Sequence, residues 1–283
     1  MNLPMKPDFN GKVAVVTGGA GVLCSEFCRA LAACGAKVAI LNRTLSKAEA
    51  LAEEIAAAGG TALAVSVNVT DAESVRAAHE TVLEKLGPCN ILVNGAGGNN
   101  PAATADDEFF SMETLRDPNK KSFFDLNGEA FSNVFSLNIM GTLLPTQAFA
   151  RDMVEKESGC IINISSMNAF TPLTKIPAYS AAKSGVSNFT EWLAVHFAGS
   201  GIRCNAIAPG FFSTAQNAKL LWNEDGTPTA RTGKILAATP MKRFGRPDEL
   251  IGALLFFCDD ACSAFVTGVV LPVDGGFNAY SGV

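Results

Sequence analysis

Three side chains near the middle of the chain have the types and the spacing needed for acid–base chemistry. Tyr179 and Lys183 stand four residues apart, and Ser166 lies 13 positions before Tyr179. On a helix, positions i and i+4 share one face, so the Lys183 ammonium is expected beside the Tyr179 phenol. An isolated tyrosine titrates near ~10, and a neighbouring cation favours its phenolate. We expect Tyr179 to take or give a proton while Ser166 holds a substrate hydroxyl or carbonyl.

The segments around these residues alternate between strand and helix patterns, which predicts an α/β fold. Short apolar runs indicate strands at residues 12–16, 37–41, 62–67, 91–93, 160–164, 203–208 and 269–273. Helical patterns separate these runs, so we expect a parallel, doubly wound sheet of about seven strands with right-handed crossovers. No long linker interrupts the alternation, and the whole chain, residues 1–283, is expected to form a single domain.

Two helix starts carry the pattern of a capping box, in which Ser or Thr is followed three residues later by Glu. Ser46 and Glu49 predict one box after the second strand, and Thr70 and Glu73 predict another after the third. We expect each hydroxyl to accept a hydrogen bond from the backbone in the first turn of its helix.

Composition and charge argue against several classes of protein. Of the 283 residues, 48% are hydrophobic, and the formal net charge is −5. The basic residues are scattered, whereas a nucleic-acid partner needs clustered Lys and Arg. The longest apolar stretch near the C-terminus, residues 250–258, is far shorter than the ~20 residues that span a membrane, and the N-terminus lacks the blocks of a signal peptide. We therefore expect a cytoplasmic protein with neither a nucleic-acid nor a membrane partner.

The cysteines and histidines do not predict a metal site. The eight cysteines contain no Cys-x-x-Cys pair and mostly lie within apolar runs, and only His79 and His196 could add imidazole ligands. We expect reduced cysteines that serve as small buried hydrophobic side chains, and no metal cofactor.

Two stretches are longer than a strand–helix connection requires. Residues 97–127 combine asparagines, prolines and charges with four phenylalanines, and residues 211–239 carry a polar loop that begins at Trp222. Each stretch follows the carboxyl end of a strand, where ligands bind in open α/β sheets, so we expect both to form walls of a substrate pocket. The alternative is that either stretch is an oligomer contact or a plain surface loop.

Three short motifs follow strands in order along the chain. Thr-Gly-Gly-Ala-Gly at residues 17–21 precedes a helix, whose free N–H groups and dipole favour a pyrophosphate. Asn-Gly-Ala-Gly stands at residues 94–97 and Asn-Ala-Ile-Ala-Pro-Gly at residues 205–210. Together with the Ser, Tyr and Lys trio, these motifs resemble the classical short-chain dehydrogenase/reductase family over nearly the whole chain. That resemblance implies a Rossmann domain that binds NAD(P)(H) and a small-molecule substrate.

The resemblance also implies roles for individual residues. Tyr179 would be the catalytic acid–base, Ser166 the substrate-orienting hydroxyl, and Lys183 both the group that tunes Tyr179 and a ligand of the nicotinamide ribose. Asn138 matches the asparagine that holds a water in the proton relay, and Thr214 matches the residue that bonds the nicotinamide carboxamide. The residues expected to bind the cofactor are Gly18, Gly21, Val22, Leu23, Asn42, Arg43, Asn68, Val69, Asn94, Ala96, Tyr179, Lys183, Pro209, Gly210, Phe212 and Thr214.

Several positions depart from the family pattern. Val22 and Cys24 stand where Gly-x-x-x-Gly-x-Gly has its later two glycines. A side chain at position 22 keeps the backbone further from the phosphate unless the loop follows a slightly different path. Asn68 replaces the usual Asp beside adenine, and its amide keeps an acceptor oxygen. At the end of the second strand, Asn42 does not repel a 2′-phosphate, and Arg43 can bind that phosphate or stack on adenine. This pair favours NADP slightly over NAD.

Within the family, longer stretches resemble the D-mannonate oxidoreductase (fructuronate reductase) branch. They are residues 95–100, 141–147, 165–179, 192–197 and 276–283. The resemblance implies oxidation of D-mannonate to D-fructuronate, or the reverse reduction, in sugar-acid metabolism. The alternatives are a gluconate 5-dehydrogenase, a reductase of another polyol or ketone, and a non-catalytic NAD(P)-binding regulatory protein.

A polyhydroxy carboxylate needs several hydrogen-bond donors and one cation. Asn99, Asn100, Asn168 and Lys175 lie on segments that enter the active edge, so they are the candidate substrate residues, with Lys175 as the partner of the carboxylate. The alternative is turn formation for the asparagines and a solvated loop charge for Lys175. Members of the family are usually tetramers, and the resemblance therefore implies a homotetramer.

Overall fold

Seven parallel strands form one sheet in the part of the chain that the structure describes. The computed structural model describes residues 7–213 and 221–282. The strand order is β3-β2-β1-β4-β5-β6-β7. The strands are β1 (Val13–Thr17), β2 (Lys37–Asn42), β3 (Thr61–Ser66), β4 (Ile91–Asn94), β5 (Gly159–Ile164), β6 (Ile202–Pro209) and β7 (Val270–Val273). The predicted doubly wound parallel sheet is confirmed, and each predicted strand boundary lies within one residue of the observed one.

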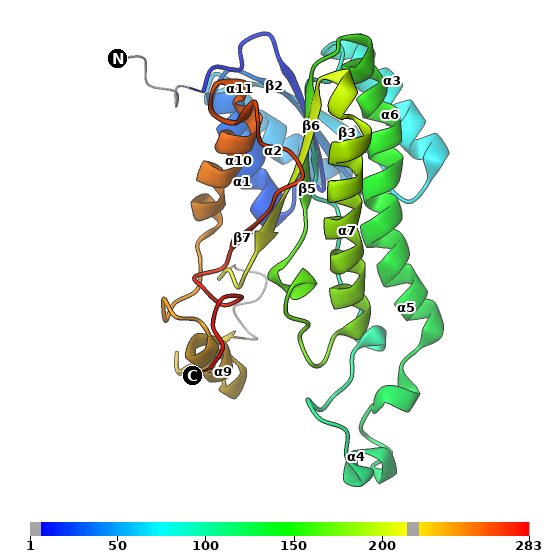
Figure 1. Ribbon diagram of the computed structural model, residues 1–283, viewed down its shortest axis with the longest axis vertical. Helices are drawn as coiled ribbons and strands as arrows, with labels where there is room; N and C mark the ends of the chain where they lie inside the picture. Colours follow the sequence, from blue (N-terminus) through cyan, green and yellow to red (C-terminus); the bar gives the residue numbers. More distant parts are fainter. Residues whose placement is uncertain (1–6, 214–220, 283) are drawn as a thin grey trace.

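Helices cover both faces of the sheet (Figure 1). One layer contains α1 (Val22–Ala33), α2 (Leu45–Ala57), α10 (Ile251–Cys258) and α11 (Asp260–Ser263), and the other contains α3 (Ala72–Lys85), α6 (Gly141–Glu155) and α7 (Pro177–His196). Beyond the carboxyl edge of the sheet lie α4 (Met112–Arg116), α5 (Gly128–Phe135) and α9 (Ala230–Ala238). Short 3₁₀ turns occur at Pro101–Ala103, Phe123–Asp125, Met167–Ala169, Ala198–Ser200 and Pro247–Leu250, and a π turn at Ser136–Met140.

Two strands of the sheet, β1 and β6, are buried along their whole length. All five residues of β1 and all eight of β6 are buried. A parallel sheet that is covered on both faces excludes water from alternate residues on either side, so its strands are continuous apolar runs. These apolar runs made the strands recognisable in the sequence. Because the strands are parallel, the carboxyl ends of β1, β2, β4, β5 and β6 lie at one edge of the sheet.

The two predicted capping boxes are wrong. The helix α2 begins after Thr44, whose side chain makes no capping hydrogen bond. The helix α3 begins after Asp71, whose carboxylate accepts from the backbone N–H of Glu73 at 2.9 Å. Asp is as good an N-cap as Ser, so the carboxylate beside Thr70 takes the position.

The first insertion forms an arm that extends beyond α5, with α4 near its tip (Figure 1). Within the arm, Lys120 Nζ lies 3.0 Å from Asp107 Oδ2. The four phenylalanines are exposed, so the arm presents an apolar surface to its surroundings. The Lys175 ammonium donates to the backbone carbonyl of Asp106, which ties the arm to the loop after β5.

An ion pair between described residues joins the second insertion to the first. Lys234 Nζ on α9 lies 2.7 Å from Glu108 Oε1 in the arm, 126 positions away in sequence. The first turn of α9 is fixed on Leu221, whose carbonyl accepts from the Thr229 N–H at 3.0 Å and from the Thr232 hydroxyl at 2.6 Å. Two long segments that leave different strands are thus joined beside the carboxyl edge of the sheet.

Within residues 7–213 and 221–282, no helix is long and apolar enough to cross a membrane. No group of three or more His, Cys, Asp and Glu side chains gathers as a metal site in those same ranges. All eight cysteines are free, and six of them are buried. Their burial agrees with the predicted packing role.

Candidate active site

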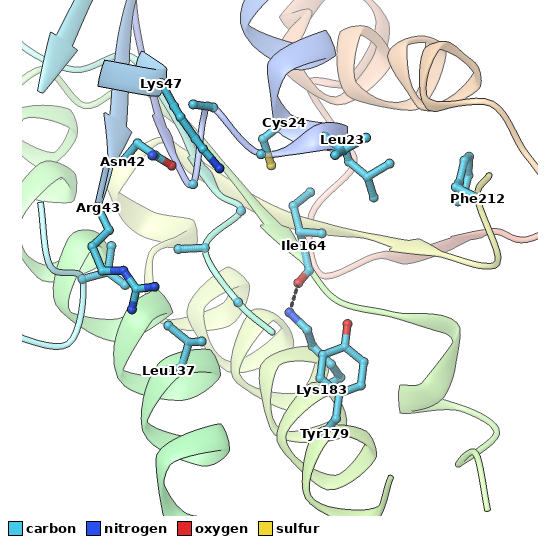
Figure 2. A pocket seen from close by; sticks show the side chains of 18 of the residues that line it. Leu23, Cys24, Asn42, Arg43, Lys47, Leu137, Ile164, Tyr179, Lys183 and Phe212 are labelled. Carbon is cyan, nitrogen blue, oxygen red and sulfur yellow. Dashed lines mark hydrogen bonds between the residues drawn. The ribbon is translucent and has the colours of Figure 1, made fainter. Parts of the chain in front are cut away.

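A cleft of about 720 Å³ opens at the carboxyl edge of the sheet. Its walls come from the loops after β1, β2, β3, β4 and β6, from α7, and from α9 of the second insertion. Figure 2 shows the part of the cleft between the end of β2 and α7. Its polar and charged lining residues are Asn42, Arg43, Thr44, Lys47, Asn68, Tyr179, Lys183 and Arg231. The strand ends therefore meet at a polar cavity, at the edge of the sheet where the sequence predicted the active site.

Tyr179 and Lys183 enter this cleft from the first two turns of α7. Pro177 is the first residue of that helix, where its fixed φ is favourable and its missing N–H costs nothing. The Tyr179 oxygen points into the cavity, and Lys183 Nζ donates to the Ile164 carbonyl at 2.7 Å (Figure 2). Nζ lies 5.7 Å from the centroid of the Tyr179 ring, so the predicted shared face is confirmed.

Burial is the main influence on the pKa values of both Tyr179 and Lys183. Burial raises the pKa of the Tyr179 phenol, and a hydrogen bond with Ser166 opposes that rise. Burial also lowers the pKa of the Lys183 ammonium to about 8. The cation donates to the Ile164 carbonyl and is itself desolvated by burial.

Ser166 stands at the end of β5, where its hydroxyl caps a short turn. Its Oγ accepts from the Asn168 backbone N–H at 3.2 Å. Asn168 is buried, and its Oδ1 has no hydrogen-bond partner among the described residues. The loop after β5 thus places one hydroxyl against Tyr179 and one buried, unsatisfied carbonyl close behind it in sequence.

Asn138 lies in the π turn at the start of α6 and is fully buried. Its Nδ2 donates to the carbonyls of Gly98 and Val134, each at 2.8 Å, and its Oδ1 accepts from the Gly98 N–H at 3.3 Å. A Cβ on the neighbouring Gly97 would lie 2.6 Å from that Oδ1 and 3.1 Å from Lys183 Nζ. The extra residue of a π turn shifts a side chain off the regular helix face. Here the shifted side chain is that of Asn138, which holds the loop after β4 through Gly98.

The glycine turn after β1 approaches the loop after β4 closely. Gly18 has a φ of +63°, and a Cβ there would lie 3.0 Å from the Ala96 backbone. The hydroxyl of Thr17 accepts from the N–H groups of Gly95 and Ala96 at 3.1 and 3.2 Å. Gly21 then precedes α1, so the free N–H groups of the first turn of α1 stand at the cleft.

The end of β2 adds cations to this wall. Asn42 Nδ2 donates to the Thr44 carbonyl at 2.9 Å, which fixes the start of α2. The side chains of Arg43 and Lys47 point into the cavity (Figure 2). Among the described lining residues no Asp or Glu occurs, whereas four cations do: Arg43, Lys47, Lys183 and Arg231. The cleft therefore favours an anionic ligand, and its helix N-terminus and glycine turn fit the pyrophosphate of a dinucleotide.

Comparison with known proteins agrees with this geometry. The family described as short chain dehydrogenase matches residues 12–225. The chain belongs to that family. An oxidoreductase of Bacillus subtilis (strain 168), described as uncharacterized, is 53% identical over 99% of this chain and 100% of its own length.

Two solved structures of the short-chain dehydrogenase fold are informative neighbours. One, from Haemophilus influenzae, is described as a proposed D-mannonate oxidoreductase with bound NAD; it is 52% identical, covers 100% of both chains and has a TM-score of 0.95. The other is a gluconate 5-dehydrogenase from Burkholderia cenocepacia in complex with NADP and tartrate, 29% identical over 98% of both chains with a TM-score of 0.83. The present chain is similar to both.

Most of the predicted cofactor residues of this short-chain dehydrogenase line the cleft. They are Gly18, Gly21, Val22, Leu23, Asn42, Arg43, Asn68, Val69, Ala96, Tyr179, Lys183, Gly210 and Phe212. Pro209 ends β6 as a buried residue outside the lining, and Thr214 lies outside the described residues. The catalytic candidates Asn138 and Ser166 lie just behind the cavity wall, in contact with Gly98 and Tyr179 respectively.

Asn94 does not reach the cleft, which corrects its prediction as a cofactor residue. It is 2% exposed, and its Nδ2 donates to Thr146 Oγ1 at 2.9 Å and to Asn163 Oδ1 at 2.8 Å. Asn94 is the last residue of β4, and its side chain points toward the helix that covers this side of the sheet instead of into the cleft. Asn94 accordingly joins β4 to β5 and α6.

Asn68 lines the cleft, but its side-chain oxygen already accepts hydrogen bonds within the chain. Its Oδ1 accepts from both the N–H and the hydroxyl of Thr70, at 3.2 and 2.9 Å. A carbonyl oxygen has two lone pairs, so the amide NH₂ is the group that Asn68 has left to offer. The predicted acceptor toward adenine is therefore engaged within the chain.

The predicted substrate residues do not line the described cleft. Asn99 Nδ2 donates to Thr104 at 3.1 Å, and Asn100 caps a short turn by accepting from Ala102 N–H at 2.9 Å. Lys175 is bonded to the carbonyl of Asp106. Turn chemistry and a structural tie thus account for these three side chains, whereas Asn168 keeps its unsatisfied oxygen close to Ser166.

Sequence reasoning missed several lining residues, including Lys47, Leu137, Arg231 and Phe244. One of them had a signal in its closeness to Arg43, because Lys47 lies in the first turn of α2, three residues after the N-cap Thr44 that follows Arg43. Arg231 follows a long polar loop, where neither periodicity nor a motif indicates which way a side chain points.

Proposed function

We propose that the chain transfers a hydride between NAD(P) and a sugar acid, with D-mannonate and D-fructuronate as the pair. One observation carries the sugar-acid part of the proposal: the described walls of the cleft carry four cations and no carboxylate, beside the reactive Tyr179. Such a cavity suits two anionic ligands, the dinucleotide and a carboxylate substrate. The 52% identical neighbour described as a proposed D-mannonate oxidoreductase supports this choice of substrate.

Each chemical role in the proposed reaction goes to a side chain that would contact the reacting atoms or position the groups that do. The bound nicotinamide would supply or accept the hydride. Tyr179 takes or gives the proton at the substrate oxygen, and Ser166 holds that oxygen by hydrogen bond. Lys183 presents a buried cation near Tyr179 from its place on the Ile164 carbonyl. Both amide hydrogens of Asn138 are engaged, so we assign its side chain to positioning of the loop at Gly98.

The test is a substrate screen that follows NAD(P)H absorbance. The purified protein is offered D-fructuronate with each reduced nucleotide, and D-mannonate and D-gluconate with each oxidised nucleotide. Turnover of the fructuronate–mannonate pair with the highest kcat/KM supports the proposal. A higher kcat/KM for gluconate would assign the chain to the gluconate 5-dehydrogenases, and absence of turnover with every substrate would favour the non-catalytic alternative.

For the nucleotide, we propose that the chain accepts NADP in addition to NAD. Arg43 and Lys47 both enter the cleft near the end of β2, and Asn42 brings no negative charge there. A guanidinium and an ammonium can together neutralise a 2′-phosphate. Comparison of kcat/KM for the two nucleotides tests this part separately.

We also propose a cytoplasmic homotetramer that forms from single-domain subunits. On the outer side of α6 and α7, Trp192 is 55% exposed and Val195 is 80% exposed. Trp192 stacks on His196 with a centroid distance of 4.5 Å, beside a groove between the two helices. Sedimentation equilibrium tests the number of subunits, and Trp192→Glu should shift the mass toward smaller species if this face joins two copies.

A further inference from the structure

Arg231 is a cation of the cleft to which the sequence assigned no role. It lies on α9, in the second insertion, and lines the same cavity as Tyr179 and Lys183. No acidic side chain in the described ranges pairs with it, whereas Lys234, one turn later, is paired with Glu108 at 2.7 Å. The two cations of α9 therefore have different environments: one is neutralised by the arm, and the other faces the cavity.

The position of Arg231 within its helix is unfavourable unless an anion is nearby. It is the second residue of α9, and the first turn of this helix contains no acidic residue. The N-terminal end of a helix carries a partial positive charge that repels a guanidinium. An anion in the cavity would be attracted both by Arg231 and by that helix end.

The local structure holds Arg231 in this place. Thr229 caps α9 by accepting from the Thr232 N–H at 3.3 Å, and Thr232 donates its hydroxyl to Leu221 at 2.6 Å. Ile235, one turn after Arg231, is buried and also lines the cavity. Side chains at i and i+4 share a helix face, so anchoring of Ile235 directs Arg231 to the cleft.

Lys175, the other candidate for the carboxylate, is placed among acids. Its ammonium is bonded to the Asp106 carbonyl and helps to lower the pKa values of Asp107 and Glu108 after their own hydrogen bonds. A substrate carboxylate at that point would meet two carboxylates of the chain. The cavity around Arg231 lacks such a charge in its described lining.

We propose that Arg231 binds the carboxylate of the substrate and thereby selects acids over neutral sugars. The proposal rests on the proposed function and names the residue that recognises the acid group. A guanidinium matches a carboxylate with two parallel hydrogen bonds, which gives it direction as well as charge. The sugar hydroxyls would then extend from α9 toward Tyr179.

The test compares Arg231→Gln and Arg231→Lys with the control Lys234→Gln, which removes a cation from the same helix. KM and kcat are measured with D-fructuronate and with the neutral ketose D-fructose, and Kd for the reduced nucleotide is measured by fluorescence. We expect Arg231→Gln to raise KM for fructuronate by about 10- to 100-fold, the range for loss of a charged hydrogen bond. The change in kcat, in the nucleotide Kd and in fructose turnover should be small, and Arg231→Lys should recover part of the loss.

An unchanged KM in Arg231→Gln, or an equal rise in Lys234→Gln, would overturn the assignment. A weaker nucleotide Kd with unchanged preference for the acid would instead place Arg231 on the nucleotide phosphates. Calorimetric binding of mannonate to the wild type with reduced nucleotide separates this inference from the proposed function. Binding of mannonate without any turnover would refute the proposed hydride transfer. In that case, weaker binding of mannonate to Arg231→Gln would support the assignment of Arg231 to the carboxylate, and unchanged binding would refute it. Absence of both binding and turnover would refute both.

Discussion

The two halves of the cleft are built in different ways. The nucleotide half consists of strand ends and helix starts: Gly18 and Gly21 after β1, and Asn42 to Lys47 after β2. The substrate half, as we propose it, is lined by Leu221, Arg231 and Ile235 of the second insertion. The pair of Glu108 and Lys234 joins that insertion to the arm, and the bond from Lys175 to Asp106 ties the arm to the loop after β5. The first half is determined by local geometry, whereas the second depends on contacts between segments far apart in sequence.

This difference predicts which substitutions should change catalysis or stability and which should change only substrate binding. Groups on regular elements are held by backbone hydrogen bonds and by close packing, so small changes there are costly. Groups on exposed insertions are held by a few polar ties that water can replace. The following experiments test that division.

The largest effect is expected where the two halves meet. Tyr179→Phe removes the proton donor and should lower kcat by about 10²- to 10⁴-fold, the usual contribution of general acid–base catalysis. The nucleotide Kd should stay near that of the wild type. Tyr280→Phe is the matched control, since it changes the only other tyrosine of the chain. Retention of turnover in Tyr179→Phe would exclude the phenol as the acid–base group.

Gly97 tests the packing of the nucleotide half. In Gly97→Ala the new Cβ would lie 2.6 Å from Asn138 Oδ1, so we expect a loss of about 1 to 3 kcal/mol in the free energy of unfolding, together with a lower kcat. Gly98→Ala is the control, because its Cβ would make only an ordinary contact of 3.7 Å with Leu137. Chemical denaturation measures both, and equal stability of the two variants would contradict the close packing.

Lys183 links activity to stability through its pKa. Because burial lowers that pKa from 10.5 to about 8, the folded protein disfavours the charged form. The destabilisation is complete below pH 8 and disappears as the pH rises toward 10.5. Lys183→Met should therefore stabilise the unliganded protein by about 2 kcal/mol at pH 7, after allowance for the lost hydrogen bond to Ile164, while it lowers activity.

The pH dependence distinguishes this cause from simple repacking. The difference in unfolding free energy between wild type and Lys183→Met should shrink between pH 8 and pH 10, as denaturation at several pH values would show. The exposed residue Lys85 supplies the control substitution Lys85→Met. A stabilisation that is independent of pH would contradict the electrostatic origin.

Asn42→Asp tests the nucleotide preference with a smaller effect. The added carboxylate at the end of β2 should repel a 2′-phosphate and shift the ratio of kcat/KM toward NAD by about tenfold, which corresponds to a like-charge cost of ~1.4 kcal/mol. Asn119→Asp adds the same charge on the arm, outside the cleft lining, and should leave the ratio unchanged. An unaltered ratio in Asn42→Asp would refute the assignment of this strand end to the ribose.

The smallest effect is expected in the substrate half. Glu108→Gln breaks an exposed ion pair with Lys234, and pairs of this kind contribute little to stability. The thermal unfolding temperature should hardly change, and KM for the sugar acid should change by less than about threefold. Glu113→Gln in α4 is the control. A large loss of stability would show that the insertions are held together as rigidly as the sheet.

Much of the fold and of the nucleotide half could be predicted because the signals are local. The buried runs of β1 and β6 identify themselves by hydrophobicity, and the glycine turn follows directly from β1. Asn94 was assigned wrongly because position at a strand end does not reveal which face its side chain takes. The N-cap of α3 was predicted wrongly because Thr70 and Asp71 are neighbours and both residue types are good N-caps.

The substrate half resisted prediction because its contacts are not local. The partner of Lys175 is a backbone carbonyl 69 positions away, and no spacing in the sequence indicates it. Arg231 is directed by Leu221 and Ile235, on either side of a long polar loop. Only the folded chain shows that one cation is tied to the arm while another faces the cavity.

Cys24 has a consequence for the durability of the nucleotide cleft. Its thiol lines the cavity, in the space left by the missing side chain of Gly95, whose Cβ would lie 2.2 Å from the sulfur. Burial raises the pKa of Cys24 to about 12, so the reactive thiolate is scarce at neutral pH. The protein can thus keep sulfur beside its nucleotide with little susceptibility to alkylating or oxidising agents.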